Sequence, residues 1–179
     1  NKYDADSKSA EEYKDLDKNG FWGIAVADHN QKKIVLTKKY YGMGQYSRYI
    51  KPGYTLLGST SLSSKKFYST AAFDATSGDT VIVVTNLNGE AQNTEIDLSA
   101  IDFSTVDTQK YTGSFAQSTM EVIRTSGDLA NGENWADVTS ETTDSSTTVS
   151  TWNPSAGKIS TTLKANSITT YVIHCKKVE

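Results

Sequence analysis

The pattern of apolar and polar residues divides the chain into two parts. From residue 54 onward, apolar and polar residues alternate in short runs, which is the period of a β-strand with one buried face. Clusters of Gly, Asn, Asp and Ser separate these runs, as expected of turns. Before residue 54, a strand-like apolar run lies between two segments with helical spacing. The pattern therefore predicts a short mixed N-terminal part and an all-β remainder.

The N-terminal part begins with a predicted short helix over residues 10–17. Ser9 and Glu12 have the spacing of a capping box, and an Asn-Gly pair at residues 19–20 would stop the helix. Residues 21–28 form an apolar run of strand length, and the polar residues after it suit a turn.

A longer helix is predicted over residues 37–50. Apolar and aromatic side chains recur there at spacings of three and four, and Pro52-Gly53 supplies a stop. Gly42 and Gly44 each cost about 1 kcal/mol relative to Ala inside a helix, so we expect a closely packed partner. The recurring residues are Tyr40, Met43, Tyr46 and Ile50.

The remainder predicts a mainly β fold, a two-sheet antiparallel β-sandwich of about eight to nine strands with one or two helices at its N-terminal end. Asn88-Gly89 is a strong hairpin signal. We expect residues 1–53 to be the end of another unit and residues 54–179 to be the sandwich domain. Candidate strands occupy residues 54–60, 67–74, 80–87, 93–99, 108–115, 121–126, 147–153, 158–164 and 168–177.

The composition of the chain limits the kinds of partner that it can bind. The 179 residues include 18 Lys and Arg against 21 Asp and Glu, a net charge of -3 that suits neither nucleic acid nor an anionic membrane. No apolar run approaches the roughly 20 residues of a membrane helix. The abundance of Ser, Thr and Tyr, with only 2 Pro, is typical of β-rich extracellular modules. We therefore expect a secreted protein, and the start at Asn1 suggests an excised piece of a longer chain.

Few residues offer chemistry. Cys175 is the single cysteine, and with only His29 and His174 as bases it reads as a lone thiol in a final strand. Residues 15–20 match the opening of a calcium loop, but its twelfth position is Val26 rather than Glu, which favours a polar turn after a helix. No metal ligand set, cofactor motif or catalytic carboxylate pair is predicted.

Aromatic rings are the remaining candidates, because they stack on the apolar faces of sugars. Trp135 and Trp152 lie in polar, loop-like surroundings and are the leading carbohydrate-binding candidates, with Tyr54 and Tyr111 behind them. A structural role in anchoring loops is favoured for both tryptophans. Rings in apolar runs are expected in the core, namely Phe21, Trp22 and Phe73.

Residues 40–54, YYGMGQYSRYIKPGY, resemble the end of the catalytic barrel in family 30 glycoside hydrolases, where a tyrosine-rich final helix leads into a side β-domain. The runs AAFD, TVIVVTNLN, RTS at 124–126, ENW at 133–135 and LKANSITTYVI resemble the strands of that domain. The resemblance covers roughly residues 20–175. It leans toward the endo-β-1,6-galactanase-like branch, with the glucuronoxylanase-like branch a close second.

The resemblance implies an endo-acting, retaining parent enzyme that degrades polysaccharide, with two catalytic glutamates on barrel strands upstream of Asn1. Glu11, Glu12 and Glu133 match neither family motif, so no catalytic residue is assigned in this chain. The resemblance also implies that the sandwich is fused to the barrel of the same parent chain and borrows a strand from the parent's N-terminal part.

Three functions follow as hypotheses. The first is a non-catalytic sandwich that braces the barrel and contacts plant or microbial polysaccharide. The second is an independent carbohydrate-binding module, and the third, weaker one is a cell-surface adhesion or interaction domain. An exposed apolar face near residues 37–50 would favour the first, whereas a row of coplanar exposed aromatic rings would favour the second.

Overall fold

The computed structural model describes residues 22–29, 32–59, 66–129, 131–143 and 148–178. The helix predicted over residues 10–17 and the calcium-loop match at residues 15–20 lie outside them. The described elements, in chain order, are β1 Ala25–Asp28, β2 Lys33–Leu36, α1 Lys38–Ser47, β3 Thr55–Leu57, β4 Phe67–Phe73, β5 Thr80–Asn86, β6 Gln92–Asp97, β7 Thr119–Ser126, β8 Glu133–Asp137, β9 Ser150–Asn153, β10 Lys158–Leu163 and β11 Ser167–His174.

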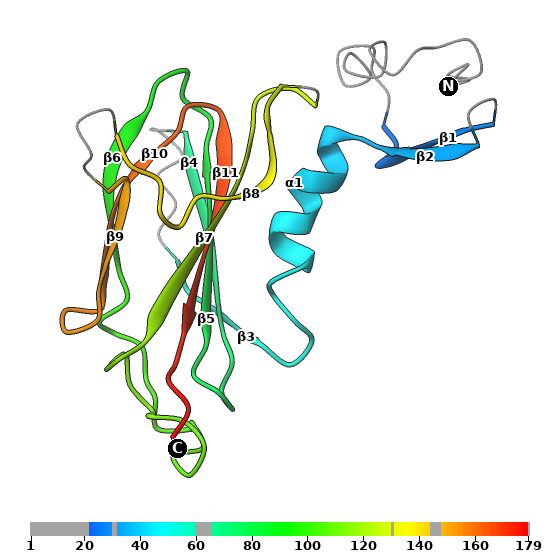
Figure 1. Cartoon of the computed structure of the whole chain (residues 1–179). Helices are drawn as coiled ribbons and strands as arrows, with labels where there is room; N and C mark the ends of the chain where they lie inside the picture. The colour runs from blue at the N-terminus through cyan, green and yellow to red at the C-terminus, as the bar shows by residue number, and fades with distance from the viewer. Residues whose placement is uncertain (1–21, 30–31, 60–65, 130, 144–147, 179) are drawn as a thin grey trace.

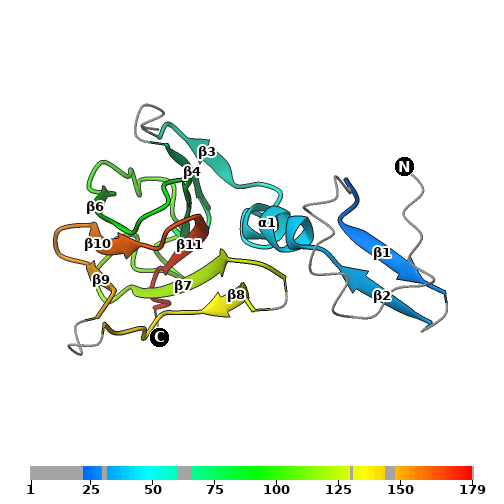
Figure 2. The ribbon, with the colours of Figure 1, turned by 90° about the horizontal axis from the view of Figure 1, so that it is seen from above.

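The strands form a two-sheet antiparallel sandwich, which confirms the predicted fold class. The larger sheet has the order β3-β4-β5-β11-β7-β8 and the smaller one β6-β10-β9. A separate hairpin, β1-β2, pairs Ala25 with Leu36 and Asp28 with Lys33. Figure 1 shows the two sheets facing each other, and Figure 2 shows α1 between the larger sheet and the hairpin.

The main core lies between the two sheets. Alternate residues of the larger sheet meet the smaller sheet there, with Ile82 on β5 and Tyr171 on β11 packed near Ile159 on β10. The Tyr171 hydroxyl lies 2.8 Å from Oγ1 of Thr161, so one hydrogen bond also joins the sheets. The apolar members are Ala71, Ile82, Val84, Leu98, Phe115, Val122, Ile159, Leu163, Tyr171 and Ile173.

A second core lies on the other face of the larger sheet, beneath α1. Val81, Val83, Ile123 and Val172 are buried there, with Tyr46, Ile50 and Trp135 packed around them. Strands β5 and β11 are thus covered on both faces. This explains why their sequences are nearly continuous apolar runs rather than simple alternations.

Helix α1 occupies most of the predicted 37–50 segment and packs on the sandwich as expected from its apolar face. Thr37 at its N-cap is buried, and its hydroxyl donates to the carbonyl of Gly23, which ties the helix to the start of the hairpin. Hydrogen bonds from Tyr49 and Ile50 to the carbonyl of Tyr46 continue the turn beyond Ser47. No second helix occurs in the described residues after 54, as predicted.

Two strand assignments from the sequence were wrong. Residues 108–115 form turns, because Asp107 accepts hydrogen bonds from the next backbone amides and only Tyr111 makes an isolated bridge, to Lys177. Residues 133–137, expected as a loop, form the edge strand β8. β8 was not predicted because its sequence is polar. Among the described strands it pairs with β7 alone, at the edge of the sheet, and this pairing contains an irregularity.

Gln45 joins α1 to the sheet through buried hydrogen bonds. Its Nε2 donates to Oγ1 of Thr125 on β7 at 2.7 Å, and its Oε1 accepts from Oγ1 of Thr170 on β11 at 2.5 Å. Gln45 and Thr170 are both fully buried. The whole amide is therefore used to bind the helix to two neighbouring strands.

We predict that Gln45→Ala lowers the free energy of unfolding by about 2–3 kcal/mol, because the hydroxyls of Thr125 and Thr170 would lose buried partners. Urea denaturation monitored by circular dichroism measures the change. Ser47→Ala is the matched control on the exposed face and should stay within about 0.5 kcal/mol of the wild type. Equal effects of the two substitutions would contradict the role of Gln45.

Candidate functional site

Trp135 on β8 packs against α1 rather than facing solvent as a free platform. Its indole Nε1 donates a hydrogen bond to the carbonyl of Tyr41 at 2.8 Å. Its ring centre lies 5.2 Å from that of Tyr40 and 5.0 Å from that of Tyr41. The guanidinium of Arg48 lies 5.0 Å from the ring centre, within cation–π range. Trp135 therefore clamps the helix to the edge of the sheet.

Gly44 allows this clamp to close. A Cβ atom at Gly44 would overlap Cζ2 of Trp135, so the indole ring would have to move. A Cβ atom at Gly42 would lie 3.7 Å from Cδ1 of Ile168, which is an ordinary contact. The close partner expected from the two glycines thus exists at Gly44, and it is Trp135.

The other aromatic candidates lie in separate places. Trp152 on β9 is half-buried at the main core, where its Nε1 donates to Oγ of Ser118 at 2.9 Å and its ring packs edge-on to Phe115. Tyr54 packs on the second core, and burial raises its pKa. Tyr111 lies at the bridge to Lys177, near the chain's C-terminus. The structure therefore does not bring the four rings together.

Trp22 differs from its expected place. It was expected in the core, but 84% of its surface is exposed beside the hairpin. Phe73, also expected in the core, is 5% exposed, and Phe21 lies outside the described residues. The prediction for Trp22 was wrong because an apolar run, such as residues 21–28, does not show whether another segment packs over it in the fold.

Cys175 follows β11 as a buried thiol. Its Sγ lies 3.4 Å from the carbonyl oxygens of Gly78 and Ser114, and burial raises the pKa of the thiol to about 11. The thiol is therefore protonated at neutral pH and poorly nucleophilic. The neighbouring His174 instead contacts Asp79, a half-buried residue directly before β5.

Glu133 belongs to a compact ion network. The buried guanidinium of Arg124 makes paired hydrogen bonds of 2.6–2.7 Å to the carboxylates of Glu133 and Glu141. Ser126 also donates to Glu133. The hydrogen bonds from Arg124 lower the pKa of Glu133 from 4.5 to about 2. Glu133 is thus held ionised and cannot supply a proton as a general acid near neutral pH.

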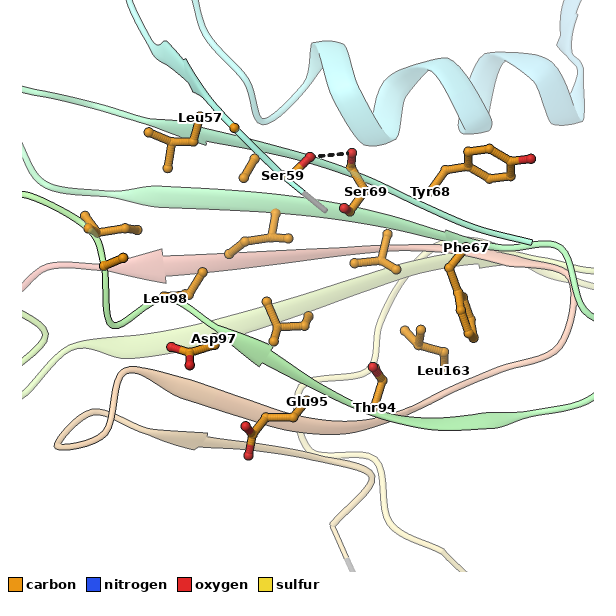
Figure 3. A pocket seen from close by; sticks show the side chains of 17 residues that line it. Leu57, Ser59, Phe67, Tyr68, Ser69, Thr94, Glu95, Asp97, Leu98 and Leu163 are labelled. Carbon is orange, nitrogen blue, oxygen red and sulfur yellow. Dashed lines mark hydrogen bonds between the residues drawn. The ribbon is translucent and has the colours of Figure 1, made fainter. Parts of the chain in front are cut away.

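A cleft opens between the two sheets along one side of the sandwich. Its volume is about 650 Å³, and β4 and β6 form its walls. Figure 3 shows Phe67 and Leu163 pointing toward each other inside it, while Glu95 and Asp97 lie on the outer side of β6. Among the described strands, β6 pairs with β10 alone, and β3 pairs with the Ala71–Phe73 end of β4. The outer edge of β6 therefore has no partner strand within the described residues.

A different surface lies beyond α1. Four large apolar side chains on the hairpin and helix are exposed, with exposed fractions of 84% for Trp22, 42% for Ile24, 72% for Ile34 and 59% for Met43. We call these residues the outer apolar surface. α1 buries one face on the sheet, and Met43 points away from that contact.

The described residues contain no group of three His, Cys, Asp or Glu side chains arranged to hold a metal ion. No helix among them is long and apolar enough to cross a membrane. The described residues form a β-sandwich with a docked helix, an open inter-sheet cleft and an outer apolar surface. These features define the class of fold.

This class of fold occurs in glycoside hydrolases of family 30, which confirms the resemblance drawn from residues 40–54 at the level of the fold. The family 30 subfamily 8 xylanase Xyn30A of Clostridium acetobutylicum superposes with a TM-score of 0.55 at 21% identity, over 92% of this chain and 37% of that one. The catalytic domain of xylanase C from Talaromyces cellulolyticus gives 0.52 at 15% identity, over 96% and 36%.

This chain therefore spans little more than a third of the length of either xylanase structure. At these identities the likeness establishes the fold. No protein-family model matches the sequence, and no curated protein matches it.

We predict that Gly44→Ala destabilises the chain by about 1–3 kcal/mol, because the new methyl group would push Trp135 out of its contact with the helix. Gly42→Ala is the control, and it should be neutral or stabilising by up to about 1 kcal/mol through helix propensity. Thermal unfolding of both variants measures the difference. A Gly44→Ala variant as stable as Gly42→Ala would argue against the clamp.

We also predict an acid-dependent loss of stability from Glu133. In the folded state, the pKa of Glu133 is lowered to about 2. Its contribution to the free energy of unfolding is therefore fully present above its pKa in the unfolded chain, near 4.5, and is lost as the pH falls from about 4.5 to about 2. Glu133→Gln should therefore be less stable at pH 7 and decline less steeply from pH 4.5 to 2. The exposed Glu90→Gln should retain the wild-type slope in urea titrations.

Proposed function

We propose that this chain is a non-catalytic module of a secreted, polysaccharide-degrading glycoside hydrolase, and that it braces the catalytic barrel of the same parent chain. The observation that carries the proposal is the outer apolar surface formed by Trp22, Ile24, Ile34 and Met43. Large apolar side chains exposed on and beside neighbouring elements, here the β1-β2 hairpin and α1, are typical of a contact with another protein surface.

The hairpin supports the same proposal. Among the described strands, β1 and β2 pair only with each other, and an isolated two-stranded sheet is marginally stable in water. Thr37 fixes the hairpin to the helix through hydrogen bonds to Gly23 and Ile24. A neighbouring barrel would cover the exposed side chains of the hairpin and stabilise it.

The inter-sheet cleft supports a second contact with the parent. An extended segment with alternating apolar residues could pair with the free edge of β6 and place side chains near Phe67 and Leu163. This matches the borrowed N-terminal strand that the family resemblance implies.

Independent carbohydrate binding is the second candidate. It is less favoured, because the indole N–H groups of Trp135 and Trp152 are used inside the fold and their rings are half-buried. Both superposed enzymes are xylanases, which favours a xylan-degrading parent over a galactan-degrading one. The endo-acting, retaining chemistry of such a parent would reside upstream of Asn1.

We predict that Trp135→Ala destabilises the chain by about 2–4 kcal/mol, since it removes a packed indole and its hydrogen bond to Tyr41. Differential scanning calorimetry measures the change, and affinity electrophoresis in xylan and galactan gels is run in parallel. If the variant keeps its melting temperature but loses retention in a gel, Trp135 is a sugar platform and the binding-module hypothesis gains.

The brace itself can be tested by thiol labelling at Met43→Cys. The introduced thiol should react quickly in the isolated chain but at least about tenfold more slowly in the complete parent polypeptide, because the barrel would cover it. The buried Cys175 provides little background reaction.

Val178→Cys is the matched control, since Val178 is 49% exposed at the opposite end of the chain. It should react at the same rate in both proteins. Equal labelling rates for Met43→Cys in the isolated chain and in the parent would overturn the brace.

A further inference from the structure

Charge is distributed unevenly along the chain. Residues 29–73 contain eight Lys and Arg and no Asp or Glu. Residues 1–28 contain seven acidic and four basic residues, and residues 74–179 contain fourteen acidic and six basic residues. The chain as a whole is slightly acidic, so a stretch of 45 residues without a carboxylate is a marked departure from its composition. The basic stretch spans β2, α1, β3 and β4.

The basic stretch also carries part of the outer apolar surface. Ile34 and Met43 lie within it, and Lys32 and Lys51 are exposed at either end of the β2–α1 segment. Lys38 differs, because its Nζ binds the carbonyl of Glu133 at 2.6 Å and so attaches the helix to β8. The segment from β2 to the end of α1 thus carries both exposed aliphatic side chains and exposed lysines.

These features distinguish between kinds of partner. An acidic polysaccharide would match the charge, but sugars stack on flat aromatic rings, and Trp22 is the one aromatic side chain among the four residues of the outer apolar surface, the other three being aliphatic. Protruding Ile and Met side chains fit pockets on a folded protein. Positive charge around an apolar centre selects a partner with the opposite charge at its rim.

We infer that the β1-β2 hairpin and α1 bind another protein. The face of that partner would have an apolar centre and an acidic rim. This inference rests on the proposed function, because it describes the face of the barrel that the module would brace. The charges would fix the orientation of the module, and the aliphatic side chains would supply most of the buried area.

The thiol-labelling assay tests this inference through its dependence on charge. In the parent polypeptide, the slower labelling of Met43→Cys relative to the isolated chain reports the docked fraction. Adding Lys32→Glu and Lys51→Glu should reduce that protection by about fivefold, since exposed charge pairs contribute modestly and reversal makes them repulsive. Raising the salt concentration from about 50 to 500 mM should reduce it in the same direction.

Lys176→Glu with Lys177→Glu is the matched control. It makes the same change of charge at exposed positions beside the C-terminus and should leave the protection unchanged. Protection that is present but insensitive to salt and to Lys32→Glu with Lys51→Glu would overturn the acidic rim while leaving the brace intact. Absence of any protection in the unreversed parent would overturn the brace itself.

A polysaccharide occupant has its own outcome in the same assay. Polygalacturonate, a polyanion without apolar protein pockets, should not slow labelling of Met43→Cys in the isolated chain. If it does, and Lys32→Glu with Lys51→Glu removes the effect, the surface binds an acidic glycan and the inference of a protein partner is wrong.

Discussion

The structure depends on covering the outer face of the six-stranded sheet. Val81, Val83, Ile123 and Val172 project from that face, and without α1 they would lie in water. Apolar contact alone is non-directional and would allow the helix to slide. The paired hydrogen bonds of Gln45 fix its position, because a displaced helix would leave buried polar groups without partners.

This constraint gives the motif in residues 40–54 a physical meaning. Gly44 admits the ring of Trp135, Gln45 binds two strands, and Arg48 stacks on that same ring. The motif is thus a signature of how a helix docks on a sandwich. Its residues carry the contacts that hold α1 against the sheet in this fold.

The sequence predicted those parts of the fold in which burial dictates residue type. Strands β5 and β11 and helix α1 were predictable because their apolar positions follow the geometry of each element. β8 was not predictable, since an edge strand needs few apolar residues. The turns at residues 108–115 were not predictable either, since an alternating run can lack a partner strand. The clamp between Gly44 and Trp135 joins residues about ninety positions apart, and only the unexplained helix glycines hinted at it.

Among the described strands, β6 has a partner on one side only, and its open edge affects how the chain can associate with a second molecule. An unpaired strand is a template for any other strand, including the same strand of a second molecule. Glu95 and Asp97 point outward from β6 and bind Lys158, so charged side chains line the strand next to the apolar cleft. Charged side chains on an edge strand oppose edge-to-edge aggregation, so we expect Glu95 and Asp97 to disfavour pairing of β6 with a second copy of the chain.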